Sequence, residues 1–208
     1  MTIFRNFGLT VAASLLVAAV GHRCQRAARA TLLIVIAAAF APIRVLQAQA
    51  GRPSQYDVQA AYLYNFAKFV RWPAEAVNGP VQLCVAGPNS FADTLRSVVK
   101  GEVIDSRQVV VRSVEKPDQA AGCSLLFIDA SAKPHSETLL ASVAGKPTVT
   151  VSDAPDFLDH GGMIQFLLVA NRVRFAVSLT PATRSGLSLS SELLRVAVSV
   201  NGRAGGGL

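Results

Sequence analysis

Several features that would assign a function quickly are missing from this sequence. The GxGxxG dinucleotide fingerprint, the Walker A phosphate loop, the GxSxG nucleophile turn and the CxxC pair do not occur, and there are only three His. Charged residues make up only 16% of the chain and apolar residues 51%, which excludes a disordered, highly charged protein. With 208 residues, the chain is expected to form about one globular domain.

Acidic residues are absent from the first 50 positions, which contain five Arg and no Lys. These five charges supply most of the formal net charge of +7, because the rest of the chain has fifteen Lys or Arg against thirteen Asp or Glu. Most of the positive charge therefore lies in a basic leader, and the domain that follows is nearly neutral. Its net charge gives no support to nucleic-acid binding.

A long apolar run is missing as well, since the runs at 7–20 and 31–43 are shorter than the roughly 20 residues of a membrane-spanning helix. The second run has the parts of a secretory signal peptide. We therefore predict an exported protein with a signal peptide over residues 1–50, cleavage after Ala50, and a mature domain over 51–208 that ends in a Gly-rich tail. The supporting residues are the basic Arg23, Arg26 and Arg29, the apolar core 31–41, and the small-x-small site Ala48-Gln49-Ala50.

The first apolar run is not needed for such a leader. One explanation is a true translation start further along the chain, for instance at Val17 or Val20 if a GTG codon initiates. The alternatives are a membrane anchor made of both short runs and a buried core helix.

Cysteine is scarce, with three in the chain, and Cys24 falls inside the predicted leader. The remaining pair, Cys84 and Cys123, lies in apolar, strand-like runs, and an even number of Cys is typical of exported domains with disulfides. We predict a disulfide between them; the alternative is two free buried thiols.

Apolar periodicity in the mature region predicts alternating helices and strands. Ser54 to Asp57 has the form of a capping box ahead of a helix that continues to Val70 and is stopped by Pro73. Asn89 and Ser90 are expected to cap a second helix, over 91–99. The further expectations are strands at 81–86, 109–111, 124–128 and 148–151, a helix at 137–143, a hairpin of 163–170 and 172–179 around Asn171, and a terminal helix starting at Ser190.

This alternation, with nearly continuous apolar strands, predicts an α/β fold: a three-layer α/β/α sandwich with a mostly parallel central sheet and an antiparallel hairpin near the C-terminus. In such sheets, ligands bind outside the carboxyl ends of the strands. A ligand crevice is therefore one hypothesis, and ordinary loop polarity is the alternative. The crevice candidates are Asn89, Ser90, Asp129, Ser131 and Asp153, with Ser152 beside the last.

Other candidate chemistry is weak. The turn Gly87 to Ser90 resembles an anion-binding strand-to-helix turn, but it has one Gly and no Lys, so a plain turn is favoured. Asp153, Asp156, Asp159 and His160 could bind a metal, but their spacing is not that of an EF-hand, and we expect no metal. A Ser-His-Asp catalytic triad could use His135 or His160, but the sequence has no nucleophile turn that would complete it. We expect no catalytic residues and no cofactor.

The segment 58–73 (VQAAYLYNFAKFVRWP) resembles the opening helix of the YfiR-like family of periplasmic proteins. The resemblance covers nearly all of the mature chain. Its further segments are 83–88 (LCVAGP), 123–128 (CSLLFI), 150–153 (TVSD), 161–164 (GGMI), 172–175 (RVRF) and 184–190 (RSGLSLS).

The resemblance implies regulation and not catalysis. Well-understood members are periplasmic repressors that hold a membrane-bound diguanylate cyclase inactive through its periplasmic portion, and release raises cyclic di-GMP and favours biofilm formation. Release involves an outer-membrane lipoprotein partner or redox damage, and members tend to form homodimers. The family fold is a three-layer α/β/α arrangement, and Cys84 and Cys123 match a family disulfide.

The sequence also departs from the family. A second family disulfide, near residues 163–169, has no counterpart because that segment contains no Cys. This departure puts a two-disulfide redox mechanism in doubt. Some members have basic residues where this chain has Ser188 and Ser190, so a ligand that relies on them would not transfer.

Three classes of function follow: a regulator that binds a membrane cyclase, a periplasmic small-molecule binding module that feeds another membrane sensor, and an enzyme, which we do not expect. Protein interfaces rely on a few aromatic or Arg anchors. The aromatic-rich opening helix offers Tyr64, Phe69 and Trp72 as candidate anchors, and their alternative role is core packing.

Overall fold

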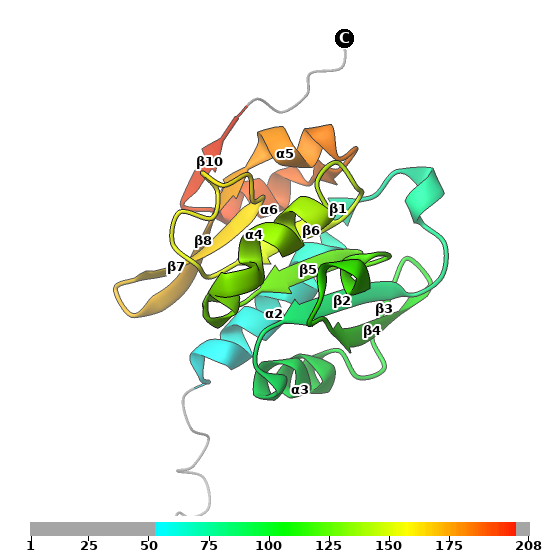
Figure 1. The fold of residues 1–208 in the computed structure, drawn as a ribbon, viewed down its shortest axis with the longest axis horizontal. Coiled ribbons are helices and arrows are strands. Elements are labelled where there is room, and N and C mark those ends of the chain that lie inside the picture. The colour runs from blue at the N-terminus through cyan, green and yellow to red at the C-terminus, as the bar shows by residue number, and fades with distance from the viewer. Residues whose placement is uncertain (1–52, 203–208) are drawn as a thin grey trace, which may run out of the picture. The chain divides into compact units, whose positions relative to one another are not determined.

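An eight-stranded sheet forms the middle layer of the fold in the computed structural model, which describes residues 53–202 apart from the side chains of residues 133 and 134 (Figure 1). Its strand order is β10-β8-β7-β6-β5-β2-β4-β3, and neighbouring strands are parallel except in the β7–β8 and β3–β4 pairs. The strands are β2 (Val81–Ala86), β3 (Val103–Ile104), β4 (Arg107–Ser113), β5 (Leu125–Ile128), β6 (Val149–Ser152), β7 (Ile164–Val169), β8 (Arg172–Ser178) and β10 (Ser199–Asn201).

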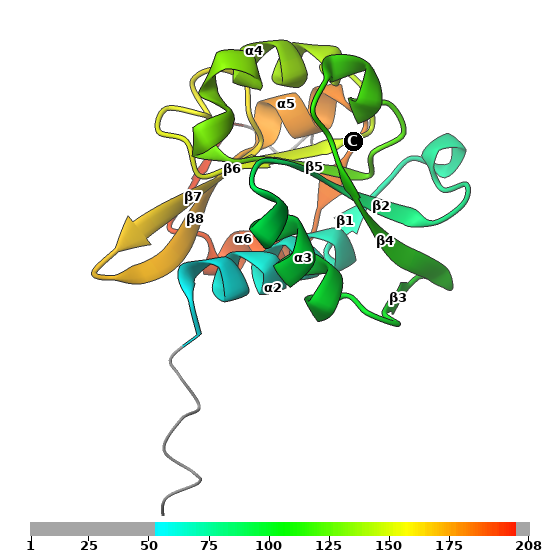
Figure 2. The same ribbon diagram turned by 60° about the horizontal axis from the view of Figure 1, so that its bottom comes forward.

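Helices cover both faces of this sheet. Figure 2 shows α2 (Gln55–Lys68), α3 (Asn89–Val98) and α6 (Ser191–Val196) on one face, and α4 (Lys133–Ser142) and α5 (Leu179–Arg184) on the other. The predicted three-layer α/β/α fold with a mostly parallel sheet is confirmed. The antiparallel β7–β8 hairpin is also confirmed, and its turn at Ala170 and Asn171 has φ of 48° and 59°, the conformation of a type I′ turn.

The core has one part on each face of the sheet because the central strands are buried on both sides. In β5, Leu125 and Phe127 belong to the cluster under α2 and α3, whereas Leu126 and Ile128 belong to the cluster under α4. This arrangement explains why β5 is a continuous apolar run without alternation.

The capping box that opens α2 is confirmed. Asp57 N donates to Ser54 Oγ at 3.1 Å, and Ser54 N donates to Asp57 Oδ2 at 2.7 Å. The expected cap of α3 is wrong: the residue at the N-cap is Pro88, with no side-chain cap, and Asn89 and Ser90 lie inside the helix.

The end of α2 also differs from the prediction. The helix stops at Lys68, and Val70–Arg71 form a short strand, β1, that pairs with β9 (Ser188–Leu189) in a separate two-stranded sheet. This pairing joins residues more than a hundred positions apart, so helical periodicity in the sequence could not reveal it. Of the three aromatic candidates, only Tyr64 lies in the helix itself.

The predicted C-terminal helix is α6, which Ser190 caps by accepting from Leu193 N at 3.3 Å. The chain then adds β10 to the sheet beside β8, which the sequence analysis did not predict. Short 3-10 helices occur at Ala74–Ala76, Pro117–Ala120 and Ala130–Ala132.

The predicted signal peptide, its cleavage after Ala50 and the Gly-rich tail lie outside the described residues. Within residues 53–202, no helix is both long and apolar enough to cross a membrane.

Candidate functional site

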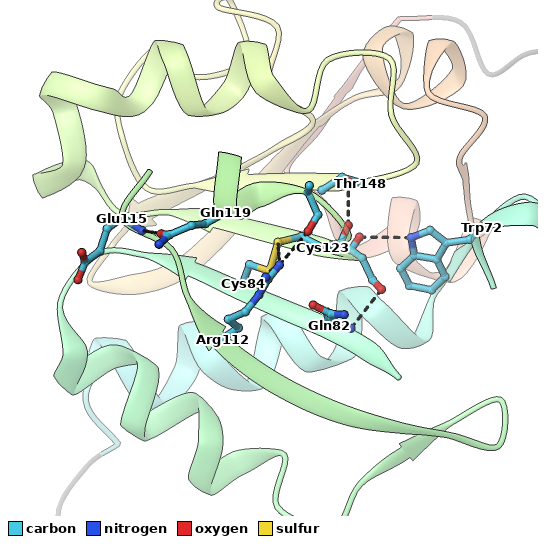
Figure 3. Close-up of a disulfide and its surroundings, with 10 residues drawn as sticks. Trp72, Gln82, Cys84, Arg112, Glu115, Gln119, Cys123 and Thr148 are labelled. Carbon is cyan, nitrogen blue, oxygen red and sulfur yellow. Dashed lines mark hydrogen bonds between the residues drawn. A yellow bond between two sulfur atoms is a disulfide. The ribbon is translucent and has the colours of Figure 1, made fainter. Parts of the chain in front are cut away.

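Cys84 and Cys123 form a disulfide that ties the middle of β2 to the residue two positions before β5 (Figure 3). Their Cα atoms are 5.9 Å apart, and both residues are buried. Arg112 from β4 lies over the bridge, with Nη2 at 3.8 Å and 3.5 Å from the two sulfur atoms and donating to Ala121 O at 2.9 Å. The bridge is therefore an internal cross-link covered by an arginine.

Two of the candidate anchors make contacts inside the domain. Trp72 Nε1 donates to Ser124 O at 3.2 Å, and the Arg107 guanidinium lies 5.6 Å from the indole centroid. The Tyr64 hydroxyl donates to Glu102, and this hydrogen bond raises the pKa of Tyr64. Both rings are half-buried, so part of each stays accessible.

The third candidate, Phe69, lines an apolar groove between α2 and α6, which we call the α2–α6 groove. Its volume is about 350 Å³. The aromatic floor is tightly packed: Phe66 and Phe175 have ring centroids 4.8 Å apart, and Tyr62 lies 5.5 Å from Phe175. The residues that line the groove are Tyr62, Asn65, Phe66, Phe69, Phe175, Glu192, Leu193 and Val196.

Sequence reasoning missed most of this groove because its two walls come from opposite ends of the folded domain. Apolar surface extends from the lining residue Val196, which is 58% exposed, to Val198 outside the groove, which is 49% exposed. The one local signal is the alternation of valines at 196, 198 and 200, which runs from α6 into the edge strand β10.

The predicted ligand crevice forms only in part. Asp129 and Asp153 follow the adjacent strands β5 and β6, and Ser131 N donates to Asp129 Oδ1 at 2.8 Å. Ala130 N donates to Asp153 Oδ1 at 2.8 Å, which ties the two loops together. Asn89 and Ser90 are exposed in the first turn of α3 and, within the described part of the chain, neither forms a hydrogen bond with these carboxylates.

Two residues of α2 join the carboxylates and were not predicted. Gln59 Nε2 donates to Asp153 Oδ2 at 3.3 Å, while Gln59 Oε1 is buried without a hydrogen-bond partner. Burial and, next, the negative charges of Asp129 and Asp153 raise the pKa of Tyr56. Burial is also the largest cause of the raised pKa of Asp153, and the Asp129 charge acts in the same direction. The crevice is therefore a largely occupied hydrogen-bond cluster.

The acidic loop after β6 does not gather into a metal centre. Among the described residues, no three His, Cys, Asp or Glu side chains come close enough to hold an ion. His160 Nδ1 instead lies 2.7 Å from Asp156 O within the same loop.

A larger cavity, the α4–α5 cavity, lies on the opposite face from the α2–α6 groove. Its volume is about 530 Å³, within the usual range for small-ligand sites. The floor is apolar, with Leu140, Val143 and Met163, while Glu137 and Arg184 lie on opposite helices. The remaining lining residues are Ala141, Ala144, Gly145, Thr150, His160, Gly161, Pro181 and Ser185.

Comparison with known proteins adds two findings. A "conserved domain protein" from Vibrio cholerae O1 biovar El Tor strain N16961, known from its crystal structure, is similar with a TM-score of 0.48 and 11% identity. The match covers 71% of this chain and only 60% of that protein. The family profile described as YfiR/HmsC-like matches residues 56–198, from the first turn of α2 to the residue before β10. The chain therefore belongs to the YfiR/HmsC-like family.

Proposed function

We propose that this chain is an exported, non-enzymatic regulator that binds the periplasmic portion of a membrane-bound diguanylate cyclase and represses it. The family match over residues 56–198 is the observation that carries the proposal, because it spans nearly the whole folded domain. Repression would lower cyclic di-GMP and biofilm formation. From the family, we also expect that the chain forms a homodimer. A further expected partner is an outer-membrane lipoprotein that releases the cyclase from repression.

The α2–α6 groove is the surface that best suits the cyclase. Its floor is aromatic, and the exposed side chains of Val196 and Val198 extend the apolar area at one end. An apolar groove of this kind receives the apolar side of a partner helix, whose anchors fill the recess. Phe69 is the candidate anchor with its ring in this groove, whereas Tyr64 and Trp72 also hold the domain together through Glu102 and Ser124.

The test of this surface uses Val196→Lys, which places a charge at the edge of the groove on a side chain that is 58% exposed. Binding of the purified domain to the periplasmic portion of the cyclase should weaken at least tenfold, as for loss of an interface anchor. The matched control is Val110→Lys, on exposed Val110 in β4, which should bind like the wild type. Equal affinity of the two variants would remove the groove from the proposal.

Alanine substitutions separate interface from core at the aromatic candidates. Phe69→Ala should weaken cyclase binding, and its main effect should be on this affinity and not on the melting temperature. Trp72→Ala should mainly destabilise the domain, because it removes the second of two hydrogen bonds to Ser124 O, which keeps only that from Val149 N, and also the ring on which Arg107 stacks. Thermal melts run beside the binding assay decide between these roles.

A second candidate function is a small-molecule binding module, which the α4–α5 cavity favours. Arg184 and Glu137 on opposite helices suit a ligand that has an apolar body and polar ends. A screen of periplasmic metabolites by thermal shift should then find a ligand whose effect is lost in Arg184→Ala. A ligand that raises the melting temperature of both proteins equally would bind elsewhere.

A further inference from the structure

The β7–β8 hairpin ends in exposed apolar side chains. In both ribbon views, its turn projects beyond the helices that cover the sheet (Figures 1 and 2). Leu168 is 61% exposed and Val169 is 48% exposed, directly before the turn residues Ala170 and Asn171. Leu168 and Val169 are consecutive in β7 and therefore point to opposite faces, so each face of the projecting hairpin tip exposes one apolar side chain.

Positive charge lies on one face of this tip, at Arg172 beside Val169 and at Arg174 one pair of residues further from the turn. Val169 is paired with Arg172, and Leu167 with Arg174, across the antiparallel ladder. Paired residues point to the same face of a sheet, so the two arginines lie beside the apolar residues of that face. Both arginines are exposed, and residues 164–178 contain no Asp or Glu. Among the described residues, neither guanidinium has an ion-pair or hydrogen-bond partner.

We propose that the tip of the β7–β8 hairpin docks on a lipid bilayer that contains anionic lipids. The apolar pair would enter the boundary between headgroups and acyl chains, and the two arginines would remain among the phosphates. A narrow, convex tip suits a soft, flat surface, because a protein partner would need a matching recess. This inference goes beyond the proposed function and does not depend on it.

The expected attachment is weak and reversible. Each Arg near an anionic surface strengthens binding about fivefold, and two small apolar side chains add far less than a lipid anchor or a transmembrane helix. Such a contact would hold the domain close to the membrane and leave the α2–α6 groove, which Phe175 lines from the middle of β8, free for a protein.

The test uses the mature domain and protein-free vesicles, at about 0.1 M salt so that charge is not fully screened. Vesicles of phosphatidylglycerol with phosphatidylcholine are compared with pure phosphatidylcholine in a flotation assay. Val169→Trp should show a blue-shifted fluorescence maximum only with the anionic vesicles. Val110→Trp, at an exposed position in β4, should show no shift, and Trp72 gives the same background in both proteins.

Charge variants then identify the contact. Arg172→Gln with Arg174→Gln should weaken vesicle binding about 25-fold, two factors of about five. Arg71→Gln with Arg195→Gln removes the same net charge from exposed positions outside the hairpin and should have a much smaller effect. Thermal melts verify that each variant is folded. Absence of flotation, equal loss in the two double variants, or binding only to a membrane protein and not to lipid would overturn the proposal.

Discussion

Asp153 is a carboxylate whose surroundings oppose its charge. Burial is the main cause of its raised pKa, and the hydrogen bonds from Ala130 and Gln59 compensate only in part. The buried Oε1 of Gln59 is unpaired next to it. An unsatisfied buried oxygen and a desolvated carboxylate together destabilise the folded state at neutral pH.

Asp153→Asn should therefore stabilise the protein at pH 7. The Asn oxygen still accepts from Ala130 N, and a rotated Gln59 amide can accept from the new Asn amide, a gain of about 1 kcal/mol. A raised folded-state pKa means that the penalty in the wild type is absent below the unfolded pKa and grows as pH rises through the folded pKa. Melting curves between pH 3 and 7 should show a stabilisation that shrinks on acidification; a constant difference would contradict the pH argument.

The Cys84–Cys123 bridge closes a separation of 39 residues. On the chain-entropy account, such a loop stabilises the fold by at most about 4 kcal/mol, and loss of a native bridge typically costs about 2–4 kcal/mol. Cys84→Ser and Cys123→Ser should each lower the free energy of unfolding by this amount, measured by urea titration. In the wild-type mature protein, denatured without reductant, thiol titration should find no free thiol, whereas two titratable thiols would refute the bridge.

At the residue scale, the sequence allowed only part of the site to be predicted. Asp129 and Asp153 end adjacent parallel strands, so their convergence follows from the order of elements. Gln59 and Tyr56 reach the same place from the opening helix, whose rotation over the sheet depends on aromatic packing such as the Tyr56–Phe91 contact. No local sequence signal encodes that rotation.

Among the elements, the strands β2, β5 and β6 were predictable because each is a nearly continuous apolar run, typical of strands covered on both faces. The strands β1, β9 and β10 have only two or three residues each, and their pairing is purely tertiary. A segment this short has no periodicity to detect. The same limit explains why the end of α2 was placed too late and why the α2–α6 groove was not foreseen.

The hairpin turn offers an element-scale prediction. Ala170 has φ of 48°, a left-handed conformation that costs most L-residues about 1 kcal/mol, whereas Asn adopts it readily. Ala170→Asn should raise the free energy of unfolding by roughly 0.5–1 kcal/mol. Asn171→Ala is the matched opposite change in the same turn and should destabilise. A lower stability of Ala170→Asn in chemical denaturation would show that this turn is not strained.

At the scale of the whole molecule, the first prediction is export with cleavage of the signal peptide. The Ala48-Gln49-Ala50 site predicts a mature protein that begins at Gly51. N-terminal sequencing of the protein recovered from the periplasm checks the cleavage position. A membrane-retained chain that still carries Arg29 would favour the anchor alternative.

The proposed repression of a membrane-bound diguanylate cyclase is tested most directly by cellular cyclic di-GMP. Deleting the gene should raise cyclic di-GMP, the rise should disappear when the partner cyclase is also deleted, and wild-type protein should restore the low level. Val110→Lys should restore it too, whereas Val196→Lys should not. Cyclic di-GMP that stays unchanged after the single deletion under all growth conditions, with no membrane partner co-purifying, would contradict the repressor account.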